Sequence, residues 1–281
     1  VVTWNEDLNA LEKQRVAASE TRRLGLGIMG IADMLNQLGI GYDSKEGIKT
    51  IAKVMEFITN AAYQASASLA AEKGASPIYS EEEYMECPFM EAALSNETQS
   101  LIRENGIRNI AIMSIAPTGS ISNIVKGIEV EGKNYIGVSG GVEPIFALYY
   151  TRRTESFKEN EFYNVFHSTI QAFIDKMGLE EEVKVADKIE DILPNYFLRT
   201  AHHIKPDKRV EIQGIIQKYI DHSISSTINL PEDVQPEVIS DIYLQAWKKD
   251  LKGVTIYRDG SRFPILSTEE EITEFQRVKE N

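Results

Sequence analysis

The sequence predicts an α/β protein built on parallel strands. Three observations favour this fold class: a strand, helix, strand succession near the C-terminal end, compact apolar runs bounded by glycine and proline, and one long amphipathic helix. The chain has 281 residues, of which 42% are hydrophobic, enough to bury the core of one large domain. We therefore expect a single domain over residues 1–281, with residues 266–281 forming a surface tail.

The first part of the chain combines a glycine-rich stretch with helices. Residues 24–30 (LGLGIMG) alternate glycine with apolar residues, which permits close packing of backbones. A short helix is expected over residues 31–38. Residues 43–74 carry apolar side chains at steps of three and four, which predicts one long amphipathic helix. Asp43, followed three residues later by Glu46, resembles a capping box at its start.

Two apolar runs occupy the middle of the chain. Residues 109–115 are bounded by Pro117 and Gly119, and residues 142–150 form a second run. Both are short and bounded by turn-forming residues, so both are predicted to be buried strands. The glycine-rich residues 127–141 between them predict a hairpin or an extended loop.

The C-terminal third gives the clearest topology. Helices are predicted over residues 161–177 and 207–226, and they precede an apolar strand at 227–230. A helix at 237–249 and a second apolar strand at 254–257 follow. Strand, helix and strand in this order predict a βαβ unit, and parallel strands joined in this way favour an α/β barrel or an open parallel sheet.

The composition excludes several classes of function. The formal net charge of -13 argues against a nucleic-acid-binding surface, because such surfaces gather lysine and arginine. No apolar segment approaches the ~20 residues that a membrane-spanning helix needs, so no membrane partner is expected. The single cysteine permits no intrachain disulfide and no thiolate metal cluster. We expect a cytoplasmic protein that binds small molecules or other proteins.

The stretch with the most chemistry joins an apolar strand to a turn of small residues. Residues 112–115 lead into Ala-Pro-Thr-Gly-Ser-Ile-Ser at 116–122. If Pro117 lies in or before the first turn of a helix, the free backbone N–H groups after it form an anion site. Gly119 lets a phosphate approach, and the hydroxyls on either side of it add donors. An ordinary helix cap explains the same residues, and residue chemistry alone favours that alternative. The candidate substrate-binding residues are Pro117, Thr118, Gly119, Ser120 and Ile121.

Other polar side chains carry weaker signals. Asp33 is expected to cap its helix or to pair with Arg22 or the arginine after it, rather than to act in catalysis. The adjacent His202 and His203 point apart on any regular element, and no carboxylate stands near them at metal-ligand spacing. His167 is interpreted as a surface or satisfied histidine. We therefore predict no metal site and assign no catalytic residue.

Five motifs, taken in order, resemble the large subunit of ribonucleotide reductases. They lie at residues 21–33 (TRRLGLGIMGIAD), 116–122 (APTGSIS), 140–146 (GGVEPIF), 226–231 (STINLP) and 253–262 (GVTIYRDGSR). Any one alone is weak, whereas five in this order over most of the chain are specific. The resemblance implies the C-terminal half of a ten-stranded α/β barrel of the ribonucleotide reductase type.

The resemblance also implies chemistry. The family's turn that matches residues 117–121 holds the substrate's phosphates, which favours phosphate binding over a helix cap. Oxygen-dependent members carry two adjacent tyrosines in the last strand, whereas this chain has only Tyr257, between Ile256 and Arg258. This departure, with residues 146–153 (FALYYTRR), resembles the adenosylcobalamin-dependent class. In that class the cofactor's cobalt–carbon bond supplies the radical.

The family's mechanism needs more cysteines than this chain has. A thiyl radical abstracts hydrogen from the ribose and two further thiols deliver the electrons, whereas Cys87 is the single cysteine here and lies in a region unlike the radical loop. We interpret Cys87 as incidental. The expected partners are a separate chain with the N-terminal half of the barrel, a ribonucleotide substrate and a thioredoxin-like or dithiol reductant. The chain is also a candidate for homo-oligomer formation.

Two hypotheses about function remain open. In the first, the chain is half of a split or processed ribonucleoside di/triphosphate reductase, inactive alone, that makes deoxyribonucleotides by radical chemistry. In the second, it is a non-catalytic, nucleotide-binding or regulatory relic. A fragment of an oxygen-dependent subunit is a third alternative. The first predicts an exposed apolar edge where missing strands dock, and the second predicts a monomer that binds a nucleotide unaided.

Overall fold

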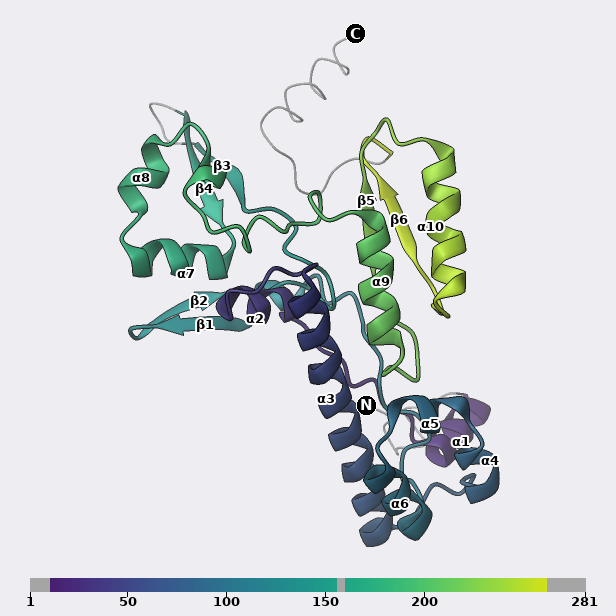
Figure 1. The fold of residues 1–281 in the computed structure, drawn as a ribbon. Coiled ribbons are helices and arrows are strands. Elements are labelled where there is room, and N and C mark those ends of the chain that lie inside the picture. The colour runs from purple at the N-terminus through teal and green to yellow at the C-terminus, as the bar shows by residue number, and fades with distance from the viewer. Residues whose placement is uncertain (1–10, 156–159, 262–281) are drawn as a thin grey trace.

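A long central helix organises the fold (Figure 1). The computed structural model describes residues 11–155 and 160–261. The central helix, α3, has 29 residues, and its buried face presents apolar side chains such as Ile51, Met55 and Tyr63. The elements are, in order, α1 (Glu12–Thr21), α2 (Ile31–Gln37), α3 (Lys45–Lys73), α4 (Glu81–Met85), α5 (Pro88–Ala93), α6 (Asn96–Asn105), the 3-10 helix η2 (Ile121–Asn123), β1 (Lys126–Val130), β2 (Lys133–Ile136), β3 (Tyr149–Glu155), β4 (Asn160–Phe166), α7 (Ser168–Met177), α8 (Glu180–Val185), the 3-10 helix η3 (Ile189–Asp191), α9 (Pro206–Gln217), β5 (Thr227–Leu230), α10 (Pro236–Lys248) and β6 (Thr255–Arg258).

Extended segments from distant parts of the chain lie side by side in parallel. Leu26 pairs with Met113, and Ile115 pairs with Ile224, in both cases in parallel. β5 continues the segment that contains Ile224 and pairs in parallel with β6. The order across this parallel array is 24–26, 111–115, 222–230 and 255–258. Within the described residues neither outer segment pairs with a further parallel strand, so the array is open and forms no closed barrel.

Close packing explains a glycine at the first edge of the parallel array. A Cβ atom at Gly27 would lie 2.3 Å from the carbonyl oxygen of Ser114, a separation that real Cβ atoms do not reach. A Cβ atom at Gly25 would lie 3.8 Å from Ser114 Cβ, which is an ordinary contact. The close backbone packing expected for residues 24–30 is therefore confirmed, and it depends on Gly27.

The predicted βαβ unit is confirmed at the other edge. α10 connects β5 to β6, which pair in parallel with Thr227 opposite Thr255 and Leu230 opposite Arg258. A small apolar core joins this unit to α9, and its buried members are Val210, Ile228, Leu230, Ile242 and Ala246. A larger core fills the rest of the molecule beneath α2, α3 and α7.

Three predicted elements differ from the structure. The helix predicted over 161–177 is wrong in its first part, because β4 pairs there with β3 in an antiparallel hairpin and α7 begins only at Ser168. The run at 142–150 is irregular until β3 begins at Tyr149, since Pro144 supplies no N–H for a strand ladder. The helix predicted over 207–226 ends at Gln217, and residues 222–225 instead hydrogen-bond to the backbone of the 111–115 segment.

The predicted hairpin and the long helix are present, but the helix begins differently. β1 and β2 form an antiparallel hairpin within residues 126–136. Ser44, not Asp43, caps α3, because its side-chain oxygen accepts a hydrogen bond from the Gly47 N–H at 2.9 Å. Asp43 instead accepts a hydrogen bond from Arg199 Nε at 2.7 Å. The expected surface tail at 266–281 lies outside the described residues.

Candidate functional site

The turn at residues 117–121 follows the second segment of the parallel array. No α-helix begins at Pro117, so the helix start considered for this position is wrong; only the three-residue η2 follows. Thr118 has a left-handed backbone with φ of 53° and bends the chain away from the array. Gly119 has an ordinary φ, and a Cβ atom built on it would meet nothing within 4 Å. The turn is mostly exposed and has open space above Gly119.

In this turn, carbonyl groups accept hydrogen bonds from the described chain, whereas the N–H groups have no acceptor within it. The carbonyl oxygen of Thr118 accepts from the Ser122 N–H at 2.9 Å, and that of Gly119 accepts from Asn123 Nδ2 at 2.7 Å. By contrast, no group in the described part of the chain accepts a hydrogen bond from the N–H groups of residues 118–121. Four successive donors at an exposed turn are the arrangement that binds anions in proteins.

The segment at residues 138–141 lies directly against this turn. Its Gly141 N–H donates to Thr118 Oγ1 at 2.8 Å, and its Val138 N–H donates to the Ser122 carbonyl at 2.8 Å. A Cβ atom at Gly140 would lie 2.9 Å from the Pro117 carbonyl oxygen. The glycines of the 138–141 segment are therefore required by close contact between two backbones.

A buried carboxylate holds the other side of the 138–141 segment. Asp33, on α2, is 2% exposed and accepts hydrogen bonds from the Ser139 N–H at 2.7 Å and Thr169 Oγ1 at 2.5 Å. His167 Nε2 lies 2.6 Å from its Oδ1. Burial alone would raise the pKa of Asp33, but these hydrogen bonds and the nearby imidazole outweigh it and hold the pKa below its ordinary value.

Sequence reasoning missed this cluster. The expected pairing of Asp33 with Arg22 is wrong, because Arg22 Nη1 donates to the Ala75 carbonyl at 2.9 Å. His167 is a satisfied histidine, as interpreted, but its partner is Asp33, 134 residues away in the sequence. No local spacing signals a contact over that separation.

A second buried ionic cluster joins α9 to β5. Arg209 pairs with Glu143, and the Arg209 side chain is only 4% exposed. Arg209 Nη2 also donates to Ser226 Oγ at 3.2 Å and to the Thr227 carbonyl at 3.0 Å. Glu143 Oε1 accepts from the Thr227 N–H at 2.8 Å. Glu143 and Arg209 Nη2 therefore tie the start of β5 to its neighbours, whereas the buried Arg209 Nη1 has no hydrogen-bond partner among the described residues.

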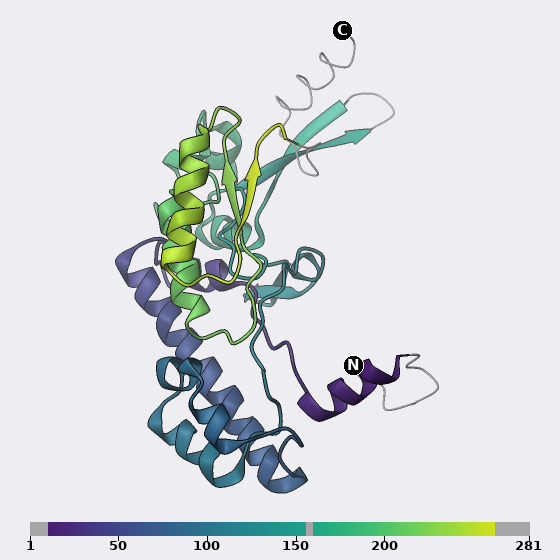
Figure 2. The ribbon, with the colours of Figure 1, turned by 90° about the vertical axis from the view of Figure 1, so that its right-hand side faces the viewer.

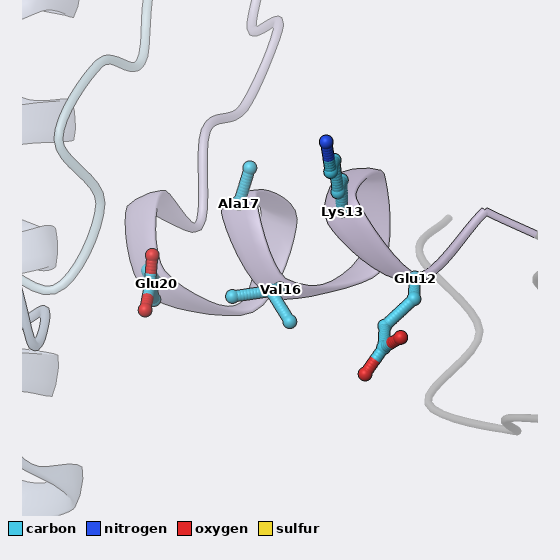
Figure 3. A pocket seen from close by; sticks show the side chains of 5 residues that line it. All are labelled: Glu12, Lys13, Val16, Ala17 and Glu20. Carbon is cyan, nitrogen blue, oxygen red and sulfur yellow. The ribbon is translucent and has the colours of Figure 1, made fainter.

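Two hollows lie elsewhere on the described surface. The larger, of about 380 Å³, is lined by five side chains that all come from α1 (Figure 3). α1 has no buried residue and stands apart from the other helices in Figure 2. The smaller, of about 160 Å³, lies between residues 146–149 and the histidines at 202 and 203. Neither hollow is lined by a residue of the turn at 117–121.

The remaining candidate side chains are separate from the turn. His202 packs edge-on against Phe146 with ring centroids 5.0 Å apart, and His203 Nδ1 lies 2.7 Å from Thr200 Oγ1. Cys87 is exposed at the start of α5. Within residues 11–155 and 160–261, no group of three His, Cys, Asp or Glu side chains is arranged to hold a metal ion. Over the same ranges, no helix combines the length and apolar character needed to cross a membrane.

Comparisons with known proteins agree on one family. The family model described as "Ribonucleotide reductase, barrel domain" matches residues 2–257. The vitamin B12-dependent ribonucleoside-diphosphate reductase of Mycobacterium tuberculosis is 30% identical over 259 residues, covering 88% of this chain and 32% of that protein. The enzyme of the same name from Thermoplasma acidophilum is 32% identical over 265 residues, covering 90% of this chain and 30% of that protein. The chain thus spans about a third of the length of these relatives.

Two further matches are named as alpha subunits of ribonucleotide reductases. The ribonucleoside-diphosphate reductase subunit alpha of Chlamydia trachomatis is 31% identical over 275 residues, covering 85% of this chain and 24% of that protein. The solved structure of the Actinobacillus ureae class Id ribonucleotide reductase alpha subunit superposes with a TM-score of 0.63 at 21% identity, covering 91% of this chain and 42% of that one. The fold is thus of the ribonucleotide reductase α/β type, and the chain belongs to the ribonucleotide reductase barrel-domain family.

Proposed function

We propose that this chain is part of a ribonucleoside di/triphosphate reductase and that its turn at residues 117–121 holds the substrate's phosphates. The observation that carries the proposal is the set of N–H groups at 118–121 that have no acceptor in the described part of the chain. Phosphate oxygens are strong acceptors, and hydrogen bonds to a charged group contribute about 1.5–3 kcal/mol each. The formal net charge of -13 gives no general attraction for anions, so these local donors provide the binding.

The turn would bind and orient the substrate without reacting with it. The N–H groups of Gly119 and Ser120 donate to phosphate oxygens, and the hydroxyl of Ser120 adds a further donor. Thr118 Oγ1 is already engaged with the Gly141 N–H, which fixes the turn before a ligand arrives. A turn held in this way loses little conformational entropy when it binds.

The radical and redox cysteines would come from a missing segment or another chain. Cys87 lies at the start of α5, in the group of helices that packs on the second half of α3, and not at the ends of the parallel segments. We propose a partner that carries the N-terminal half of the barrel, with a thioredoxin-like or dithiol reductant. The described array is open at both edges, and Leu24 and Leu26 on its first segment are 52% and 45% exposed. Exposed apolar residues on an open edge favour docking of further barrel strands.

The names of two similar enzymes support adenosylcobalamin as the cofactor of the complete reductase. The described residues do not fit that group by themselves. Gly140 and Gly141 are accounted for by contact with residues 116–118. Of the two hollows described above, the larger is lined by α1 alone and the smaller has only about 160 Å³. Neither could enclose a corrin ring. We propose that other parts of the complete reductase hold the cofactor.

Reconstitution tests this function. The chain would be mixed with a candidate N-terminal partner, adenosylcobalamin, a ribonucleotide and a dithiol reductant, and deoxyribonucleotide would be measured. We expect product with the unmodified chain and none with Gly119→Val in the same mixture. Absence of product with every partner tried, under conditions where an intact reductase is active, would overturn the proposal. Nucleotide binding without product would instead support a non-catalytic relic.

A further inference from the structure

We propose that the buried Asp33 carboxylate is a positioning residue for the turn at 117–121, acting through the 138–141 segment. This inference rests on the proposed function, because it assumes that the turn binds phosphate. Asp33 itself is 2% exposed, so a substrate has no access to its carboxylate. Its role follows from what it holds in place.

The 138–141 segment is fixed on one side by α2 and α7. The Ser139 N–H donates to Asp33 Oδ2 at 2.7 Å, and the Ser139 carbonyl accepts from the Gly30 N–H at 2.8 Å. Directly before the 138–141 segment, the Gly137 carbonyl accepts from Ser168 Oγ at 2.6 Å. Both backbone groups of Ser139 are thus engaged by α2 and its N-cap residue, Gly30.

On its other side the 138–141 segment contacts both ends of the turn. The Gly141 N–H donates to Thr118 Oγ1 at 2.8 Å, and the Val138 N–H donates to the Ser122 carbonyl at 2.8 Å. A Cβ atom at Gly140 would lie 2.9 Å from the Pro117 carbonyl oxygen, so the two backbones touch. A shift of the segment must therefore move the turn or break these hydrogen bonds.

The carboxylate is suited to this task because several donors converge on it. Thr169 Oγ1 and the Ser139 N–H donate to it, and His167 Nε2 lies 2.6 Å from it. A buried carboxylate with several hydrogen bonds has one allowed position, and its loss leaves these groups without their partner. Four N–H groups bind a phosphate well only if their directions are fixed in advance. The Asp33 cluster provides that fixation.

The test compares two carboxylates in the full-length chain. Asp33→Asn removes the charge that accepts from the Ser139 N–H, and Asp43→Asn removes another carboxylate charge, 12% exposed and paired with the partly exposed Arg199, before α3. Inorganic pyrophosphate is the probe, its affinity is measured by calorimetry, and the amide resonances of residues 118–121 are followed by NMR. We expect Asp33→Asn to weaken binding about tenfold, as loss of an outer hydrogen-bond partner does at metal sites. The same variant should shift these resonances, and Asp43→Asn should do neither.

Stability and binding are separated by a second set of variants. His167→Leu and Thr169→Val each remove one hydrogen-bond partner of Asp33 and keep its carboxylate. If Asp33→Asn does not fold, these variants test the positioning role instead. His167→Gln, which retains a side-chain donor, should bind pyrophosphate more tightly than His167→Leu.

The two proposals fail in different ways. Unchanged affinity and unchanged turn resonances in folded Asp33 or His167 variants would overturn the positioning role and leave the phosphate site standing. Absence of pyrophosphate binding by the unmodified chain would overturn the phosphate site itself.

Discussion

The turn at 117–121 and the Arg209–Glu143 cluster both place polar groups next to the parallel array, but they differ in how those groups are satisfied. In the cluster, Arg209 is 4% exposed and Glu143 bonds both to it and to the Thr227 N–H. In the turn, the N–H groups of residues 118–121 have no acceptor within the described chain, and the space above Gly119 is open. Polar groups with internal partners hold the fold, whereas exposed donors without them are available to a ligand. This difference predicts that mutations in the cluster lower stability, whereas mutations in the turn weaken ligand binding and change stability little.

The largest expected effect is on stability, at the cluster. Arg209→Met should lower the free energy of unfolding by about 3 kcal/mol, because it leaves Glu143 without its charge partner. Lys208→Met is the matched control, since its pair with Glu211 is 39% and 35% exposed and solvent screening leaves such a pair little effect on stability. Urea denaturation measures both. Equal losses in the two variants would contradict the structural role assigned to Arg209.

The next effect is on binding, at the turn. Gly119→Val places a branched side chain in the space where a phosphate oxygen would lie. Loss of two charged hydrogen bonds of about 1.5 kcal/mol each corresponds to about a hundredfold weaker nucleotide binding. Gly253→Val is the control, because a Cβ atom there also meets nothing within 4 Å and φ is ordinary. Calorimetry with a ribonucleoside diphosphate should separate the two variants, with unfolding curves little changed in both; equal affinities would count against the site.

A third effect concerns the backbone contact next to the turn. Gly27→Ala should cost about 2 kcal/mol of stability, because the added methyl group would lie 2.3 Å from the Ser114 carbonyl oxygen. Gly25→Ala should be nearly neutral, since its nearest neighbour would be 3.8 Å away. Thermal unfolding of the two variants checks this contrast. A similar melting temperature for both would show that the first two segments of the array are not as closely packed as described.

The smallest effect concerns the cap at the start of α3. Ser44→Ala should cost about 1 kcal/mol, because the Gly47 N–H at the start of α3 loses its acceptor. Asp43→Ala tests the alternative cap and should act through the ion pair with Arg199 instead. Raising the salt concentration should reduce the cost of Asp43→Ala and leave that of Ser44→Ala unchanged. The opposite pattern would restore the capping box suggested by the sequence.

The elements predicted well from the sequence are those with local causes. α3 follows from apolar side chains at helical spacing, and the β5–α10–β6 unit follows from two short apolar strands around an amphipathic helix. The conformation of Thr118 has no such cause. It is fixed partly by the Gly141 N–H, 23 residues away, so the sequence favoured a helix start that is absent.

The elements that were predicted wrongly also depend on contacts between residues far apart in the sequence. Residues 222–225 continue a plausible helix pattern, but hydrogen bonds to Met113 and Ile115 draw them into the parallel array. Asp33 and His167 lie 134 residues apart, so neither spacing nor composition could have joined them. Sequence reasoning singled out the turn because small, hydroxyl-bearing residues follow an apolar run, and its role in binding phosphate stays a prediction. It missed the groups that hold the turn in place.

The most direct test of the central claim is an NMR titration of the full-length chain with a ribonucleoside diphosphate and, separately, with the same ribonucleoside without phosphates. If the turn is the phosphate site, the amide resonances of residues 118–121 shift with the diphosphate and stay unchanged with the ribonucleoside. If those resonances stay unchanged with both ligands, or if only residues around the hollow at 146–149 respond, the turn does not bind the substrate's phosphates and the account is wrong.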